Sequence, residues 1–97
     1  MHRFTAPLWR YDGDAAWYFV TVPVEVSDDV RELTEGSRRG FGSVRVRATV
    51  GATTWTTSVF PDGKRGAFLL PVKKAVRTAE GLDEGDDVGV LLELLDH

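Results

Sequence analysis

Two lysines and an arginine gather where a helix is expected to begin after Pro71. Lys73 and Lys74 fall in the expected first turn, and Arg77 follows one turn later. The unpaired N–H groups and the positive dipole end of a helix favour negative charge, so each exposed cation there costs a few tenths to about 1 kcal/mol. A bound anion would reverse this unfavourable term. The three residues are therefore a candidate anion site. The alternative is that they are solvated, or paired with acids elsewhere in the fold.

A glycine-rich segment supplies two further candidates for the same ligand. Residues 36–43, read Gly-Ser-Arg-Arg-Gly-Phe-Gly-Ser, lead into an expected strand. Phosphate-binding glycine loops lead into a helix N-terminus instead, so the dinucleotide and P-loop motifs are not met. Arg39 and Ser43 are the candidate anion contacts in this segment, and a plain flexible loop is the alternative.

Trp55 lies among hydroxyl side chains in a threonine-rich stretch, residues 53–60. On strand alternation it shares a face with Thr57 and Val59, while Ser58 and Phe60 lie on the other face. A tryptophan beside hydroxyls can line a pocket, so Trp55 and Ser58 are candidate pocket-lining residues. The core is the commonest place for a lone tryptophan and is the alternative.

The residues show no catalytic or metal-binding pattern. A serine nucleophile needs a base, yet the two histidines stand at opposite ends of the chain, and no motif marks a pair such as Ser58 with Lys73. The chain has no cysteine, which excludes disulfides, thiolate metal sites and cysteine nucleophiles. The acids at positions 83–87 match no calcium-loop spacing, and a solvated turn is the expected alternative. We therefore expect a protein that is not an enzyme, with no catalytic residue, no metal site and no cofactor.

Length and charge narrow the function classes further. The 97 residues form one expected domain, 1–97. Twelve Lys and Arg against fifteen Asp and Glu give a net charge of −3, which argues against nucleic-acid binding but leaves room for a local basic patch. No run approaches the ~20 apolar residues of a membrane helix, and the N-terminus has no signal-peptide core. We expect a cytoplasmic protein without membrane association.

Six strands and two short helices are expected to position these residues. The strands are expected at residues 3–11, 17–23, 43–50, 53–60, 67–70 and 87–95, with the second one buried on both faces. Pro7 lacks an N–H, so the first strand should lie at an edge or contain a bulge. Ser27 is the expected N-cap of the first helix, followed by Asp28 and Asp29 at the positive end of its dipole. The second helix follows Pro71 and ends at Gly81.

One pattern occurs twice along the chain. Phe19–Val24 is followed by a helix, a glycine-containing turn and a strand from Val44, and some 48 positions later Phe68–Val72 leads to the same succession ending in a strand from Val88. Two such copies predict a mainly β fold: a double-split β-barrel with two short helices, built from two pseudo-twofold strand-helix-strand halves that complete each other's sheet. Both halves lie in one chain, which predicts a monomer. The alternative is that an α+β protein contains two such units by chance.

Several segments of the chain carry a resemblance to a known family. They are Arg39-Gly40-Phe41-Gly42-Ser43-Val44, Thr54-Trp55-Thr56-Thr57-Ser58-Val59-Phe60-Pro61, Leu69-Leu70-Pro71-Val72-Lys73-Lys74-Ala75-Val76-Arg77, Gly81-Leu82 and Gly85-Asp86. Through them the sequence resembles the prokaryotic domain of unknown function DUF1905 over nearly its whole length, from about Phe4 to Leu94. The resemblance implies a double-split β-barrel, the architecture of AbrB- and MazE-like transcription factors, in which two chains each contribute half. Other family members carry a YdeI-type domain, which is not among these 97 residues. The family has no established activity, so the resemblance implies the fold and not the function.

The leading hypothesis is a non-enzymatic small-barrel binding module for an anionic ligand. That ligand would be a small phosphate-bearing molecule or a nucleic-acid backbone. One alternative is a regulatory or accessory protein that acts through protein contacts, for example with a YdeI-type domain on another chain. A second alternative is a DNA-binding regulator, by analogy with AbrB-like folds.

Overall fold

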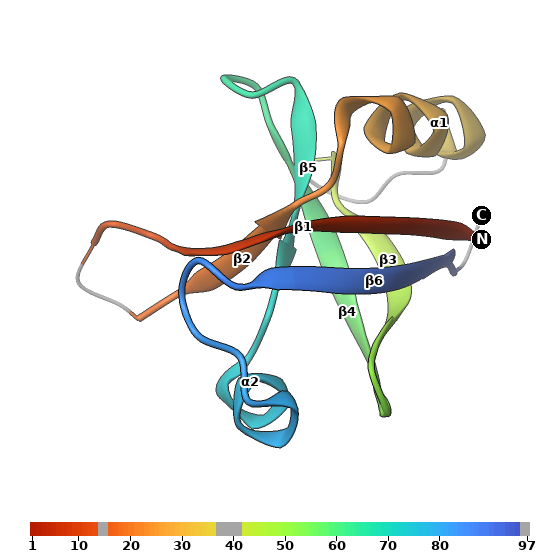
Figure 1. The fold of residues 1–97 in the computed structure, drawn as a ribbon. Helices are drawn as coiled ribbons and strands as arrows, with labels where there is room; N and C mark the ends of the chain where they lie inside the picture. Colours follow the sequence, from red (N-terminus) through yellow and green to blue (C-terminus); the bar gives the residue numbers. More distant parts are fainter. Residues whose placement is uncertain (14–15, 37–41, 96–97) are drawn as a thin grey trace.

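The computed structural model describes residues 1–13, 16–36 and 42–95. The six strands close into one antiparallel barrel in the order β1-β2-β5-β4-β3-β6, with α1 above and α2 below it in Figure 1. The predicted mainly β fold is thereby confirmed. The elements are β1 (His2–Arg10), β2 (Tyr18–Thr21), α1 (Val24–Thr34), β3 (Val44–Val50), β4 (Thr53–Asp62), β5 (Ala67–Pro71), α2 (Lys74–Glu80) and β6 (Asp87–Leu94).

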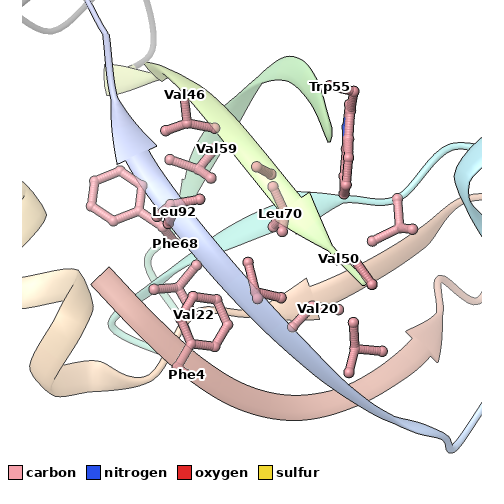
Figure 2. Packing of buried hydrophobic residues seen from close by; sticks show 14 of the residues in the cluster. Phe4, Val20, Val22, Val46, Val50, Trp55, Val59, Phe68, Leu70 and Leu92 are labelled. Atoms are coloured by element: carbon pink, nitrogen blue, oxygen red, sulfur yellow. The ribbon is translucent and has the colours of Figure 1, made fainter. Parts of the chain in front are cut away.

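Alternation of apolar and polar residues determines which face of each strand points into the barrel. In β3, Val44, Val46, Ala48 and Val50 are buried, whereas the arginines between them are exposed. Successive side chains of a strand point to opposite faces, so one face fills the core and the other meets water. Figure 2 shows Phe4 and Phe68 toward one end of this core and Trp55 at the other.

The barrel consists of two interlocked halves with the same order of elements. The first half is β1-β2-α1-β3 and the second is β4-β5-α2-β6. Strand β3 pairs with β4 and β6 of the second half, and β6 pairs with β1 and β3 of the first. Each half therefore gives its last strand to the other, and neither could close a barrel alone. This is the double-split arrangement predicted from the repeat.

Backbone hydrogen bonds between β2 and β5 obey the pseudo-twofold relation. The Val22 N–H donates to the Phe68 carbonyl at 2.9 Å, and the Val72 N–H donates to the Tyr18 carbonyl at 2.9 Å. Equivalent residues in these two bonds are 50 positions apart in the sequence. The predicted spacing of 48 came from aligning Pro23 with Pro71, and it is two residues too short. Pro23 is the N-cap of α1, whereas Pro71 is the last residue of β5 and caps no helix.

The first helix begins earlier than predicted. Pro23 is its N-cap, so Ser27 lies inside α1 and the predicted capping role of Ser27 is wrong. Proline cannot donate to the β2–β5 ladder, and its restricted φ suits the start of a helix. The buried Ser27 hydroxyl instead donates to the Val22 carbonyl at 3.1 Å and accepts from the Phe68 N–H at 3.0 Å. It thereby attaches α1 to both β2 and β5.

Two smaller expectations also change. Asp28 and Asp29 lie beyond the first turn of α1, where the Arg31 guanidinium pairs with Asp28 at 2.6 Å. Pro7 does not lie at a sheet edge, because the described strands close the barrel. It is the residue at which β1 leaves β6 for β2, a position where a missing backbone donor is tolerated. Within the described ranges, neither helix is long and apolar enough to cross a membrane.

We expect Ser27→Ala to lower the free energy of unfolding by about 2 kcal/mol, because it leaves the buried Phe68 N–H and Val22 carbonyl without the hydroxyl. Urea denaturation followed by circular dichroism measures the change. Thr78→Ala removes an exposed hydroxyl on α2 and should change the stability by less than about 0.5 kcal/mol. Equal stability of wild type and Ser27→Ala would show that these two bonds do not hold α1 in place.

Candidate functional site

A cavity of about 490 Å³ opens beside α2, between the start of β2 and the middle of β4. We call it the α2 cavity. Aromatic and cationic side chains make up most of its wall, together with hydroxyls of β4. The aromatic residues are Trp17, Tyr18, Trp55 and Phe60, and the cationic residues are Lys73, Lys74 and Arg77.

Two contacts place α2 against the barrel so that its cations meet β2. The Val72 N–H donates to the Tyr18 carbonyl at 2.9 Å, which extends the β2–β5 ladder up to the residue before Lys73. At the other end of α2, the Thr53 hydroxyl donates to the Glu80 carboxylate at 2.6 Å. The helix is thus attached at both ends, and Lys73 and Lys74 lie beside the start of β2.

Arg77 occupies in the second half the position that Ser27 has in the first. Its Nε–H donates to the Val72 carbonyl at 3.2 Å, as the Ser27 hydroxyl donates to the Val22 carbonyl. The Arg77 guanidinium carbon lies 3.8 Å from the centroid of the Tyr18 ring, a cation–π contact. These two contacts fix the guanidinium at the cavity wall. Within the described part of the chain, its two terminal nitrogens make no further hydrogen bond.

The corresponding end of the first half is closed. There Phe68 is fully buried under the eleven residues of α1, and Ser27 is fully buried with it. In the second half, Tyr18 is only half-buried and α2 has seven residues. The exchange of a buried serine for an arginine, and the shorter helix, leave this end of the barrel open and charged.

The charged side chains that the structure describes in the wall of the α2 cavity are all positive. Among the residues that the structure describes, no carboxylate lies within ion-pair distance of Lys73, Lys74 or Arg77, and none lines the cavity. Positive charges that converge in a hollow with low-dielectric walls create a local positive potential. The arrangement is therefore complementary to a negatively charged group.

Four of the candidate residues from the sequence lie together in this cavity: Lys73, Lys74, Arg77 and Trp55. Trp55 is 8% exposed, so it belongs to the core and also forms part of the cavity wall. Ser43 and Ser58 do not line the cavity. Arg39 lies outside the described residues.

The helix dipole contributes less to this site than the sequence implied. Lys73 is the N-cap of α2 and Lys74 its first residue, but the helix has only seven residues. What brings the cations together is the packing of α2 against the barrel, where they share one cavity with Tyr18 of β2 and with residues of β4.

Sequence reasoning missed Trp17, Tyr18 and Phe60. The second strand was expected to be buried on both faces, yet Trp17 precedes β2 and is 53% exposed. Phe60 is 43% exposed on the outer side of β4. Strand alternation did separate Phe60 from Trp55, which was a signal that Phe60 points away from the core. Nothing in the sequence linked it to Lys73.

A second hollow, of about 390 Å³, contains an arginine that is already neutralised. Its wall includes Trp9, Phe19, Asp62 and Arg65. The Arg65 guanidinium forms an ion pair with Asp62 and lies 4.5 Å from the centroid of a Trp9 ring. The hydrogen bond from Arg65 holds the pKa of Asp62 below its ordinary value. Among the described residues, two acids and two arginines line this hollow, whereas the charged residues that line the α2 cavity are all cations.

We expect a fall in pH to remove the stability that the Asp62–Arg65 ion pair contributes. A carboxyl whose pKa is lowered by folding adds stability that is complete above its unfolded pKa of about 3.9 and is lost as the pH falls through the lower folded value. Wild type should therefore lose more stability than Asp62→Asn when the pH falls from about 5 to about 2. Urea denaturation at several pH values measures this difference.

A direct check of the cause is the Asp62 pKa in Arg65→Met, followed by NMR of the carboxyl carbon. It should rise toward the ordinary value. An unchanged pKa would show that Arg65 does not cause the lowered pKa of Asp62.

The fold and its cavity define a class: small, closed six-stranded barrel domains built from two interlocked halves. Within that class the chain belongs to the family described as Domain of unknown function (DUF1905), whose model matches residues 4–92. The resemblance seen in the sequence is thereby confirmed. No curated protein matches the chain.

Proposed function

We propose that this protein is a non-enzymatic binding module that holds an anionic ligand in the α2 cavity. One observation carries the proposal: Lys73, Lys74 and Arg77 converge on a single cavity in which, among the described residues, no acid compensates their charge.

The three cations suit a phosphate or a carboxylate by different means. Arg77 is held by Tyr18 and the Val72 carbonyl, so its remaining N–H groups form a planar, pre-oriented donor set. Lys73 and Lys74 are exposed, and their ammonium groups can follow the position of the anion. One fixed donor and two mobile charges are enough to hold a single anionic group.

The dimensions of the cavity favour a small molecule over a polymer backbone. Its volume of about 490 Å³ falls in the range of small-molecule sites. A net charge of −3 opposes the long-range attraction on which backbone-tracking proteins depend. The described residues of the lining include threonines and lysines but neither histidine nor carboxylate, the commonest general bases, and this supports binding rather than catalysis.

We expect saturating anions to raise the melting temperature of the wild type and not that of the double variant Lys73→Ala, Lys74→Ala. A ligand at about 100 times its Kd adds about 2.7 kcal/mol, which is roughly 10 °C or more for a domain of this size. Thermal shift with inorganic phosphate, ribose 5-phosphate and AMP measures the effect.

The matched control is Arg3→Ala, Lys64→Ala. It removes the same charge from exposed positions that do not line the cavity, so it should respond like wild type. No shift with any of the three anions, or equal shifts in the two double variants, would refute the proposed anion site.

We also propose that the protein is a monomer, and the cytoplasm is the compartment expected from the sequence. Both interlocked halves come from one chain, so closure of the barrel needs no second copy. Light scattering at micromolar concentration should give a mass near 10.7 kDa. A stable dimer would contradict this part of the proposal.

A further inference from the structure

We propose that the ligand of the α2 cavity is a planar aromatic ring that carries an anionic group, the chemistry of a nucleotide. This inference rests on the proposed anion site and adds the part of the ligand that the cations do not explain. Four aromatic side chains line the same cavity as the three cations. Two of them, Trp17 and Phe60, are exposed although they belong to the wall of a hollow.

Trp17 is held as a platform for stacking. Its ring packs nearly parallel to Phe19, with centroids 6.1 Å apart and planes 9° apart. Phe19 is itself held between Trp9, at 5.2 Å, and Tyr11, at 6.4 Å. One face of the Trp17 ring is therefore occupied by Phe19, and 53% of the residue is still exposed. A ring fixed in this way stacks on a ligand without first being ordered.

Phe60 is the second exposed ring of the cavity. It is paired with Leu69 across β4 and β5, which fixes its backbone, and 43% of the residue remains exposed. An exposed large aromatic side chain is a marker of an interaction site when several gather together. Aromatic side chains next to cations are the usual means of binding a base and its phosphate, because every base has a face that stacks.

Two groups of residues in the cavity wall would recognise different parts of the ligand. Trp17 and Phe60 offer apolar ring faces, while Lys73, Lys74 and Arg77 offer positive charge. A sugar phosphate would use the cations alone, and a nucleoside would use the rings alone. A nucleotide would use both, so its affinity should exceed that of either fragment.

Isothermal titration calorimetry of the wild-type chain tests this with AMP, adenosine and ribose 5-phosphate. We expect AMP to bind at least tenfold more tightly than either fragment. Trp17→Ala should lose about tenfold in AMP affinity and leave ribose 5-phosphate binding unchanged. Phe60→Ala should act in the same direction. Leu33→Ala is the matched control, because Leu33 is a large apolar residue of α1 that is 55% exposed and lies outside both the cavity and the aromatic cluster.

The results separate this inference from the one on which it rests. If ribose 5-phosphate binds as tightly as AMP, or if Trp17→Ala and Leu33→Ala bind AMP equally, the aromatic ligand is overturned and the anion site stands. If neither AMP nor ribose 5-phosphate binds the wild type, both proposals fail. An adenine tetranucleotide identifies the source of the ring: tenfold weaker binding than AMP indicates a free nucleotide, and equal or tighter binding indicates a nucleotide presented on a single strand.

Discussion

The exchange of the last strand between the two halves is the constraint on which the rest of the structure depends. Strand β3 pairs with β4 and β6, and β6 pairs with β1 and β3, so each half completes its sheet with a strand of the other. Because β3 and β6 each pair with strands of the other half, the chain must cross the barrel after β2 and again after β5. The two crossings contain α1 and α2, which therefore lie on opposite sides of the barrel (Figure 1).

The pseudo-twofold relation holds for the backbone and is broken by the side chains. The same carbonyl position accepts a hydrogen bond from the Ser27 hydroxyl in one half and from Arg77 Nε–H in the other. Because either donor satisfies that carbonyl, the fold tolerates a small buried residue or a large cationic one there. Ser27, a buried residue of the longer helix α1, helps to close the first end around Phe68. Arginine, beside the half-buried Tyr18, leaves the second end open.

The gathering of three cations in one hollow, and not the net charge of the chain, sets the electrostatic character of the α2 cavity. Three arginines elsewhere in the described chain are paired with acids: Arg31 with Asp28, Arg47 with Glu93, and Arg65 with Asp62. Such pairs contribute little to stability when exposed, but they cancel the field at a distance. Arg3, Arg10 and Arg45 form no ion pair with a described residue, but they do not line the α2 cavity. No acid among the described residues pairs with the three cations of the α2 cavity, so a chain with a net charge of −3 still has a hollow whose described charges are positive.

The sequence by itself determined the strands, the repeat and the clustering of cations at the start of α2, because alternation and local spacing are properties of neighbouring residues. The sequence placed the start of α1 at Ser27, as an N-cap. The Ser27 hydroxyl instead accepts a hydrogen bond from the Phe68 N–H, 41 positions away, and local spacing could not predict that partner. Only the tertiary structure decided that Trp17, Tyr18 and Phe60 meet Lys73 and Arg77 in one cavity. That meeting depends on the register of β2 against β5, which is set by packing across the closed barrel and leaves no mark in the local sequence.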